Sequence, residues 1–420
     1  MRVLLIGGGG REHALAWKLA QSPRLSALYA APGNPGIARH ATCVPIKADR
    51  IDALAAFAER ERVDLTVVGP EAPLVAGIVD LFQSRGLAIF GPSRAAAAIE
   101  GSKAFAKALM AKHGIPTARF RTFGEPAAAR GYCRTIGAPL VVKADGLAAG
   151  KGAIVCATLA EADEAIALCL EHRAFGAAGA TVVVEEFMRG EEASFFALSS
   201  GAEVIPLGVA QDHKRVYDGD QGPNTGGMGA CSPAPIVDEP TAALVMERII
   251  RPTIRALAAE GRPYRGLLYA GLMLTSKGPK VVEFNCRFGD PECQAVLMRL
   301  ADDLLPLLHA AATGAALPMS VTWGTGAAVC VVLASQGYPG EYPTGLPIAG
   351  VDEAEALPGV VVFHAGTARK DGTLVTAGGR VLGVTARGDS VSAATDLAYR
   401  GVDRVCFQGM HYRKDIARRR

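Results

Sequence analysis

The sequence predicts a multidomain protein of α/β and α+β class, with an N-terminal doubly wound parallel sheet, a central mixed domain and a small C-terminal mixed domain. The chain has 420 residues, and a prior of about 150 residues per domain suggests three domains. Its first hundred residues alternate short apolar runs with segments of helical period, which is typical of a parallel sheet flanked by helices. Further along, strands paired around glycine-rich turns replace that alternation.

The N-terminal domain is expected over residues 1–101. Its strands are predicted at Val3–Ile6, Ser26–Ala30, Leu65–Val68 and Leu87–Phe90. Its helices are predicted over Arg11–Gln21, around Ile51–Ala58 and over Leu74–Arg85. Each strand ends in a turn rich in Gly or Pro, and ligands of such sheets bind beyond the carboxyl ends of the strands. We therefore expect a glycine-lined ligand crevice at that edge.

The central domain is expected over residues 102–318 and the C-terminal domain over residues 325–420. A helix at Ser102–His113 opens the central domain, and a lid subdomain is expected over residues 117–190. The lid elements are strands at Leu140–Lys143, Ala153–Ala157 and Thr181–Glu185 and a helix at Leu159–Glu171; more strands follow within residues 192–207 and 269–284. The C-terminal elements are strands at Ala327–Ala334, Val360–His364, Leu374–Ala377 and Arg380–Ala386 and a helix at Val391–Tyr399. Asp371-Gly372 predicts a tight hairpin between two of these strands.

Composition excludes several classes of function. Half of the residues are hydrophobic and 20% are charged, so the chain is not intrinsically disordered. Its 44 basic and 41 acidic residues leave a formal charge of only +3, which argues against a dedicated nucleic-acid-binding protein. Nine cysteines without a Cys-x-x-Cys pair predict neither a disulfide framework nor a zinc site. No apolar stretch is long enough to span a membrane, so we expect a cytoplasmic protein that binds neither nucleic acid nor membrane.

The glycine run Gly7–Gly10 follows the first predicted strand and opens a helix. A dinucleotide fingerprint would need a third glycine where this chain has Glu12, and an acid after the second strand, where it has Ala30 to Gly33. A helix opened by glycines still presents backbone N–H groups that suit a phosphate. We favour a phosphate site over a merely tight turn.

A second glycine-rich string spans Val142–Gly152. It is not a Walker A loop, because only three residues separate Gly146 from Gly150. Strands on both sides predict a hairpin that could close over phosphates as a lid. Lys143 lies inside an apolar strand and needs an anionic partner; the alternative is a lysine that reaches out of an edge strand.

Two further strings carry acids beside apolar residues. An adenine slot with a carboxylate for the ribose could be built from Glu185, Phe187, Met188 and Glu192. Taken alone, this string is better explained as a strand, a turn and solvated acids. Glu283 and Asn285 alternate with apolar residues, so both oxygens lie on one face of a strand, where they suit Mg²⁺. Arg287 follows on that face, placed to meet a phosphoryl or acyl oxygen; the alternative is an edge strand with a polar face.

A long polar loop completes the set of candidate sites. It contains Gln211–Arg215 and the glycine-rich run Asp220–Gly229. Loops of this length in a compact chain are usually functional or disordered. The glycine content and the lack of charge after Asp220 favour an ordered site loop.

Together these pieces resemble the nucleotide site of the ATP-grasp superfamily, with Lys103, Lys143 and its glycine lid, Glu185 to Glu192, and Glu283-x-Asn285. Longer strings resemble the phosphoribosylamine–glycine ligase family within it. These strings are Gly7–Ala14, Ala31–Gly36, Gly69–Leu74, Lys143–Gly152, Gln211–Arg215, Glu283–Glu292 and Tyr412–Ile416. The resemblance covers nearly the whole chain and implies that the central domain is an ATP-grasp domain.

The resemblance implies that glycine, phosphoribosylamine and ATP give glycinamide ribonucleotide, ADP and phosphate, through a glycyl phosphate, in the second step of purine synthesis. It implies ATP as co-substrate and Mg²⁺, with Mn²⁺ as an alternative, held by Glu283 and Asn285. Lys103 and Lys143 would hold ATP phosphates, Arg287 the transferring phosphoryl group, and Asp212 the ammonium of glycine. Phosphoribosylamine would be bound by Gly9, Gly10, Arg11, Asn34 and Glu71, and Asp290 would be a further substrate-binding residue.

Two departures from the family pattern matter. The strand before Glu283 reads Tyr269 to Met273 without an acid, so we expect two protein metal ligands only. Cys286 and Cys293 stand where other residues are expected in this family's string; they could make the site sensitive to thiol reagents, but small buried packing residues are the preferred interpretation. We further expect a monomer, with transient contact to the preceding enzyme as an open hypothesis. The rival functions are a related ATP-grasp ligase or carboxylase, a nicotinamide oxidoreductase and a binding protein without catalytic activity.

Overall fold

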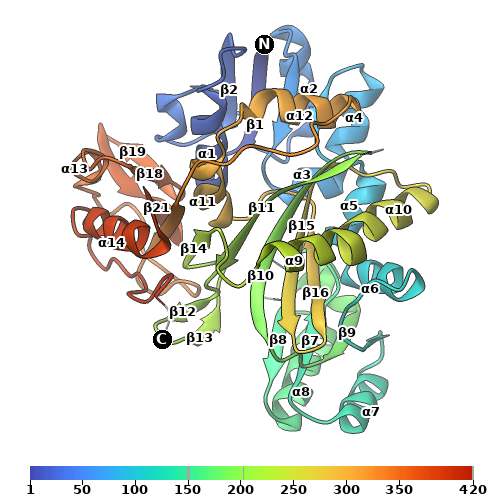
Figure 1. Cartoon of the computed structure of the whole chain (residues 1–420). Coiled ribbons are helices and arrows are strands. Elements are labelled where there is room, and N and C mark those ends of the chain that lie inside the picture. Colours follow the sequence, from blue (N-terminus) through green and yellow to red (C-terminus); the bar gives the residue numbers. More distant parts are fainter. Residues whose placement is uncertain (149–151, 202, 419–420) are drawn as a thin grey trace.

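The computed structural model describes residues 1–148, 152–201 and 203–418. The N-terminal sheet lies at the top of Figure 1, a large twisted sheet occupies the centre, and a small four-stranded sheet lies at the bottom. The C-terminal elements lie on the left, beside the central sheet. Across the described ranges, no helix combines the length and the apolar character needed to cross a membrane.

The N-terminal sheet is parallel, with the strand order β3-β2-β1-β4-β5. Its strands are β1 (Arg2–Gly7), β2 (Ala27–Pro32), β3 (Thr42–Cys43), β4 (Leu65–Val68) and β5 (Ile89–Phe90). Its helices are α1 (Gly10–Leu19), η1 (Ile37–Arg39), α2 (Ile51–Arg60), α3 (Glu71–Ala76), α4 (Ile78–Ser84) and α5 (Arg94–Gly101). Leu4 and Ile6 pack in one core and Val3 and Leu5 in another, so both faces of β1 are buried, as a doubly wound sheet requires.

The helix predicted over Leu74–Arg85 is in fact two helices. Gly77, with φ +96°, ends α3 and begins α4, and a left-handed residue at that point is incompatible with a continuous helix. Helix α5 and the two-residue strand β3 were not predicted.

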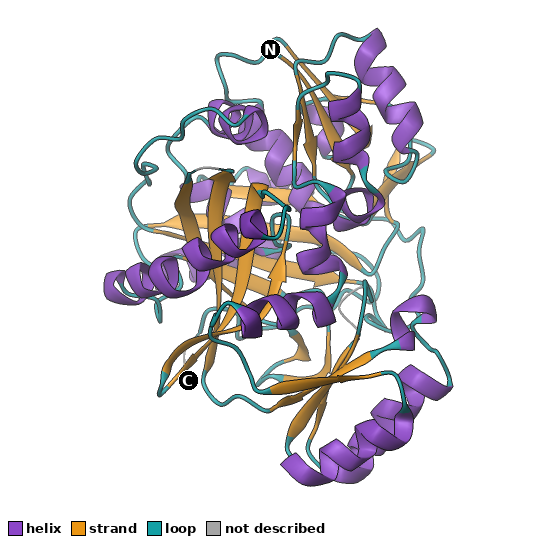
Figure 2. Ribbon diagram, turned by 90° about the vertical axis from the view of Figure 1, so that its right-hand side faces the viewer, coloured by secondary structure: helices purple, strands orange, loops and turns teal. Residues whose placement is uncertain are grey.

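The lid is a four-stranded antiparallel sheet with the order β6-β9-β7-β8. Its elements are β6 (Phe120–Phe123), α7 (Pro126–Ile136), β7 (Leu140–Ala144), β8 (Ala153–Cys156), α8 (Leu159–Ile166), η2 (Ala167–Glu171), η3 (Gly176–Ala180) and β9 (Val182–Glu186). Figure 2 shows its helices against one face of this sheet. The hairpin β7–β8 is confirmed. Residues 149–151, which include Gly150 and Lys151 of the predicted lid string, lie outside the described residues. Strand β6 and helix α7 were not predicted.

The central sheet has eight strands in the order β16-β15-β10-β11-β14-β17-β21-β18. Its strands are β10 (Glu191–Ser200), β11 (Val204–Asp212), β14 (Gly229–Ser232), β15 (Arg265–Thr275), β16 (Gly278–Asn285), β17 (Ala327–Ala334), β18 (Val360–His364) and β21 (Arg380–Gly388). The short strand β14 pairs with β11 on one side and β17 on the other, so the C-terminal strands continue the central sheet. No sequence pattern predicted this junction, because Gly229–Ser232 is not an apolar run.

The remaining elements surround the central sheet. They are α6 (Lys103–Lys112), β12 (Arg215–Tyr217), β13 (Gln221–Asn224), α9 (Glu239–Val245), η4 (Met246–Ile250), α10 (Arg251–Ala259), α11 (Glu292–Arg299), α12 (Leu304–Thr313), α13 (Val351–Glu355), β19 (Thr367–Lys370), β20 (Thr373–Thr376) and α14 (Val391–Val402). The tight hairpin at Asp371-Gly372 is present, with φ +50° and +79° at the two residues. It joins β20 to the unpredicted strand β19 rather than to β18.

The glycine turn of the N-terminal sheet lies against the segment that follows β16. The Arg11 guanidinium donates a hydrogen bond to the Phe288 carbonyl over 3.1 Å. The backbone N–H of Arg11 points to the Asp290 carboxylate, 3.4 Å away. The carboxyl edge of the parallel sheet therefore faces the polar string that ends β16.

Candidate active site

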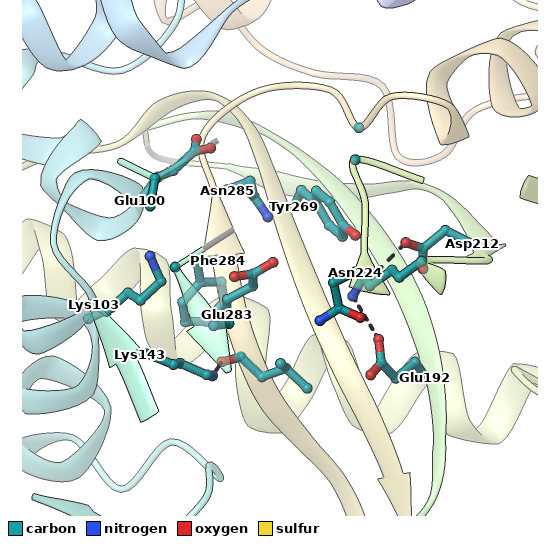
Figure 3. Close-up of a pocket in the computed structure, with 18 of the residues that line it drawn as sticks. Glu100, Lys103, Lys143, Glu192, Asp212, Asn224, Tyr269, Glu283, Phe284 and Asn285 are labelled. Carbon is teal, nitrogen blue, oxygen red and sulfur yellow. Dashed lines mark hydrogen bonds and ion pairs between the residues drawn. The ribbon is translucent and has the colours of Figure 1, made fainter. Parts of the chain in front are cut away.

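A cavity of about 480 Å³ lies where the N-terminal sheet, the lid, the central sheet and the C-terminal strands meet. Of the residues proposed from sequence as site residues, all except Gly9, Gly10 and Asn34 line it. Figure 3 shows Lys103 and Lys143 on one side of Glu283. Asp212 and Glu192 lie on the other side.

Strand β16 supplies the floor of the cavity. Glu283 and Asn285 pair across from Gly271 and Tyr269 of β15, and both line the cavity, as the alternation in the sequence predicted. Burial alone would raise the pKa of Glu283, but surrounding cations, Lys214 foremost, lower it below its usual value. The carboxylate is therefore ionised and faces open space.

These oxygens fit a hard divalent cation. Carboxylate and amide oxygens are the ligands that Mg²⁺ takes, and it usually completes its coordination with water and phosphate oxygens. Within residues 1–148, 152–201 and 203–418, no three Asp, Glu, His or Cys side chains come together as a ready-made metal site. A cation at Glu283 and Asn285 would thus depend on a bound nucleotide for the rest of its ligands.

Arg287 is held by acidic side chains from two other elements. Its Nε lies 3.1 Å from a Glu71 carboxylate oxygen, and its Nη2 lies 2.9 Å from a Glu100 oxygen. The same Nη2 donates to the Asn285 amide oxygen over 3.1 Å. Burial would lower the pKa of the guanidinium, but these carboxylates raise it above its usual value. Arg287 is thus a permanent cation beside the candidate metal ligands.

Glu100, at the end of α5, is a site residue that the sequence analysis missed. Its carboxylate also accepts hydrogen bonds from the backbone N–H of Cys286 at 2.7 Å and from the Cys286 thiol at 3.0 Å. Burial raises the pKa of Glu100, against the lowering effect of Arg287. Cys286 and Cys293 are 1% and 0% exposed, which confirms them as small buried packing residues.

The lid contributes a buried ion-pair cluster. The Glu185 carboxylate lies 3.1 Å from the Lys143 ammonium and 3.0 Å from the Lys107 ammonium, and all three side chains are at most 5% exposed. Lys143 therefore has the anionic partner that its place in an apolar strand required. Burial lowers the pKa of Lys107 to about 8, with Glu185 opposing this shift and Lys143 adding to it. Lys103 donates to the Gly146 carbonyl over 3.0 Å, at the base of the lid hairpin.

Replacing Glu185 with glutamine should reduce the free energy of unfolding by about 3–5 kcal/mol, because Lys107 and Lys143 would become uncompensated buried cations. Urea unfolding at pH 7 measures this loss. At pH 10 the loss should shrink, because a lysine left without its carboxylate titrates at a lower pH. A variant as stable as the parent would show that the cluster does not hold the lid.

The opposite wall of the cavity is formed around Lys214. Its ammonium lies 2.7 Å from a Glu192 oxygen and 4.0 Å from an Asp212 oxygen. Burial raises the pKa of Asp212 to about 7; Lys214 lowers it, and the nearby Glu292 adds to the rise. Glu292 in turn accepts hydrogen bonds from Tyr269 at 2.8 Å and from Ser194 at 3.2 Å.

The glycine turn is organised by Glu12 and Asn34. The Glu12 carboxylate accepts a 2.6 Å hydrogen bond from the Gly9 N–H and pairs with Arg11 Nε at 2.6 Å. A Cβ on Gly7 would lie 2.6 Å from the Glu12 side chain, so glycine makes room for this acid. Asn34 donates to the Gly8 carbonyl at 2.9 Å and to the His364 carbonyl at 2.8 Å. Its side chain therefore joins the turn to the C-terminal strands.

The C-terminal strands also reach the cavity, which the sequence did not indicate. Arg380, at the start of β21, lies 3.4 Å from an Asp290 carboxylate oxygen and donates to the Gly226 carbonyl over 2.7 Å. Tyr338 accepts a 3.0 Å hydrogen bond from the Gly226 N–H through its hydroxyl group. No local pattern around Arg380 or Tyr338 distinguishes them from other surface residues. By contrast Lys107 had a signal, because it lies one helical turn from Lys103 on α6.

Lysines at the base of the hairpin β7–β8, together with an acid and an amide on β16 in the same cavity, are typical of ATP-grasp enzymes. Residues 101–293 match the family model described as phosphoribosylglycinamide synthetase, ATP-grasp (A) domain. Residues 1–100 match the N domain of the same synthetase and residues 328–419 its C domain. The chain therefore belongs to the phosphoribosylglycinamide synthetase family.

Relatives of known name agree over the full length. A phosphoribosylamine–glycine ligase of Rhizobium meliloti (strain 1021) is 56% identical over 416 residues, which cover 99% of this chain and 98% of that protein. The crystal structure of phosphoribosylamine–glycine ligase from Thermotoga maritima superposes with a TM-score of 0.87 at 34% identity, covering 99% of this chain and 100% of that one. The biotin carboxylase domain of Hydrogenobacter thermophilus 2-oxoglutarate carboxylase, solved with MgADP, has a TM-score of 0.74 at 17% identity, covering 98% of this chain and 91% of that one, and shares the fold.

Proposed function

We propose that this chain ligates glycine to 5-phosphoribosylamine, using ATP, to give glycinamide ribonucleotide, ADP and phosphate, the second step of de novo purine biosynthesis. The observation that carries the proposal is that one cavity brings the N-terminal crevice residues Arg11 and Glu71 to the ATP-grasp lysines and to the acids of β16. A ligase that couples a phosphorylated sugar amine to an ATP-activated carboxylate needs this junction.

The chemistry proceeds in two transfers. A carboxylate oxygen of glycine attacks the γ-phosphorus of ATP, the bond to ADP breaks, and glycyl phosphate forms. The amine of phosphoribosylamine then attacks the acyl carbon. The bond between that carbon and the bridging oxygen breaks, so phosphate leaves with that oxygen, and the amine loses a proton. Catalysis of such steps is mainly positioning and charge stabilisation. A bound divalent cation would neutralise charge on the phosphates.

The proposal assigns roles to the residues of the cavity. Lys103 and Lys143 neutralise ATP phosphates, and Arg287 stabilises the transferring phosphoryl group. The adenosine subsite is assigned to Glu185, Phe187, Met188 and Glu192; Glu185 already pairs with Lys107 and Lys143, so its part there is to hold Lys143. Glu283 and Asn285 hold the cation.

The glycine subsite is assigned to Asp212, which would accept the ammonium group. Phosphoribosylamine is assigned to Gly9, Gly10, Arg11, Asn34, Glu71 and Asp290. Among these, Asn34 acts through the turn it ties to the C-terminal strands. Closure of the lid would keep glycyl phosphate away from water.

The proposal also covers the metal, the domain limits, the cellular location and the oligomeric state. The divalent cation is Mg²⁺, with Mn²⁺ as a substitute, because both take oxygen ligands. The functional units are residues 1–101, residues 102–318 with the lid at 117–190, and residues 325–420. The enzyme acts in the cytoplasm as a monomer, without nucleic acid or membrane, and receives its labile amine through transient contact with the preceding enzyme.

The test of the function is ADP release from the purified protein with ATP, Mg²⁺, glycine and freshly generated phosphoribosylamine, each omitted in turn. We expect release to require both glycine and the amine, with glycinamide ribonucleotide formed in equal amount. Release driven by bicarbonate or by another carboxylate would assign a different ATP-grasp reaction. No release with any combination would refute the enzyme assignment.

The KM for glycine should be about ten-fold higher at pH 6 than at pH 8, because Asp212, with its pKa raised to about 7, must be ionised to bind an ammonium group. The ammonium of glycine remains protonated over this range, so the ionisation of its proposed partner Asp212 sets the sign of the effect. Steady-state kinetics at saturating ATP and amine measure the effect. The variant Asp212→Asn should lose this dependence; if it keeps the dependence of the parent, another group binds the ammonium.

A further inference from the structure

Residues near the C-terminus form hydrogen bonds with a loop that lines the cavity. The loop spans residues 213–229, contains the hairpin β12–β13 and presents Lys214, Asn224 and Thr225 to the cavity. Residues 411–417, here called the C-terminal segment, lie against it. We propose that this segment positions the loop and thereby sets the affinity for glycine, with Arg413 as its central positioning residue. In this role the segment is called the latch. The inference rests on the proposed function, from which it takes the glycine subsite beside Lys214.

Arg413 joins the segment to the hairpin. Its side chain is 1% exposed. Nη1 donates to an Asp220 carboxylate oxygen at 2.8 Å and to the Arg215 carbonyl at 3.1 Å. Nε and Nη2 donate to the two oxygens of Asp415 at 2.7 and 2.8 Å. Because a buried guanidinium needs all of its partners, the position of Arg413 fixes both one strand of the hairpin and its tip.

Asp415 extends the contact to the hairpin tip. Its Oδ2 accepts a 2.8 Å hydrogen bond from the Gly219 N–H as well as its bond from Arg413. Burial would raise the pKa of Asp415, but Arg413 and Gly219 lower it well below its usual value. The Asp415 carboxylate that joins Arg413 to Gly219 is therefore ionised at neutral pH.

Three further hydrogen bonds link the segment to the loop. The Lys414 N–H donates to Asp218 Oδ1 at 2.7 Å, and the Ala417 N–H donates to His213 Nε2 at 3.1 Å. His411 Nε2 lies 2.8 Å from the Val216 carbonyl oxygen. Burial, with a contribution from Arg413, lowers the pKa of His213 to about 4, so its ring is neutral and can accept that bond at neutral pH.

The loop transmits its position to the cavity through the backbone. The Thr225 N–H donates to the Lys214 carbonyl at 2.8 Å, and the Met228 N–H donates to the His213 carbonyl at 2.8 Å. Lys214 in turn holds Glu192 and Asp212. A shift of the hairpin therefore moves the cation that orients the proposed glycine ligand.

The latch is anchored to the C-terminal helix. The Tyr399 hydroxyl of α14 donates to the Arg413 carbonyl at 2.7 Å and accepts from the Ile416 N–H at 3.0 Å. Ile416 is fully buried in the C-terminal core. The glycine subsite is in this way tied to an element nearly two hundred residues away in the chain, without contact between Arg413 and the substrate.

The first experiment compares Arg413→Met with the parent enzyme. Loss of charge-assisted hydrogen bonds to the loop should raise the KM for glycine at least about ten-fold, while the KM for phosphoribosylamine stays within about two-fold. The KM for ATP should rise less than that for glycine, because Lys214 also pairs with Glu192. Hydrogen exchange of the Gly219, Thr225 and Met228 amides should accelerate by a similar factor, with β17 and β21 unchanged. Arg413→Lys, which keeps the charge but not the planar fork, should fall between the two.

The matched control is Lys414→Met, which removes an equal charge from an exposed side chain but leaves its backbone N–H bond to Asp218. It should leave all three KM values unchanged. Should Arg413→Met fail to fold, Asp220→Ala removes the partner at the hairpin tip, whose side chain is 70% exposed. It should raise the glycine KM in the same direction, and where both variants fold their effects should be less than additive.

The outcomes separate the latch from the function. A parent enzyme that releases ADP only with glycine, and Arg413→Met and Asp220→Ala variants with unchanged glycine KM, would overturn the latch and leave the function standing. Equal rises in the KM of all three substrates, or unchanged exchange in the loop, would also overturn it, because the role would then be general stability. A parent enzyme that ignores glycine would overturn the proposed function itself.

Discussion

Glu283→Ala is expected to lower metal-dependent turnover by about three orders of magnitude while the fold survives, since a catalytic cation contributes several kcal/mol of transition-state stabilisation. Glu283 is the ionised carboxylate on the cavity floor, and its pKa is lowered by the cations around it. Among the described residues, no hydrogen bond to its side chain is present that the fold would lose. The melting temperature should therefore change by no more than about 2 °C.

Activity should be measured as ADP release across a titration of Mg²⁺. Glu283→Gln keeps the size of the side chain but not its charge, and should need a higher Mg²⁺ concentration for the turnover that remains. The control Glu247→Ala removes an exposed carboxylate from η4 and should behave as the parent. Near-parent turnover of Glu283→Ala would remove the metal assignment, whatever the outcome for the other site residues.

The N-terminal sheet could be predicted from sequence because its signals are local. Strand β4 has the bounds Leu65–Val68 that its apolar run predicted. The failures there also have local causes: Thr42–Cys43 is too short to show a period, and Gly77 breaks an otherwise continuous helical pattern. In the C-terminal part, β14 escaped prediction because it owes its place to β11 and β17 rather than to its own residues.

The site residues likewise divide into those with a local sequence signal and those placed by the tertiary fold. Residues on one strand, such as Glu283 and Asn285, reach the cavity together because the period of a strand places them there. Residues that other elements bring to the cavity have no such periodic pattern in the sequence. Glu100 on α5, Tyr338 and Arg380 became visible as site residues only when the fold joined their elements to β16 and to the loop.

Ion pairs explain why several acids of the cavity stay ionised despite their burial. Three acids of the cavity each have a cation from another element: Glu185 has Lys107, Asp290 has Arg380, and Glu71 has Arg287. Burial would raise the pKa of Glu71 and of Asp290, yet the pKa of each is lowered by its arginine partners. The same ion pairs that keep the site charged thus also hold the domains together. A substitution in one of these pairs should therefore affect both stability and catalysis.

Arg287 is where these two roles can be separated. Arg287→Met should reduce turnover by about two to four orders of magnitude, through loss of the charge that faces the phosphoryl group. It should also reduce the free energy of unfolding by about 3–5 kcal/mol, because Glu71 and Glu100 would lose the cation that compensates them. Urea unfolding and ADP release measure the two losses independently.

The stability loss should depend on pH. Without the guanidinium, the folded-state pKa of Glu71 rises above the value of about 4.3 expected when unfolded, and that of Glu100, which is already raised, rises further. The folded state then binds more protons than the unfolded state, so stability falls as the pH rises through the interval between those pKa values. We therefore expect the deficit of Arg287→Met, relative to the parent, to be larger at pH 8 than at pH 5.

A second substitution isolates catalysis. In Arg287→Met with Glu100→Gln, one uncompensated carboxylate is gone, so most of the stability loss and of its pH dependence should be reversed. Turnover should stay as low as in the single variant, since Glu100 acts on Arg287 and not on the substrate. If turnover returns together with stability, Arg287 is a structural residue, and the phosphoryl group must be stabilised by the lysines of the lid instead.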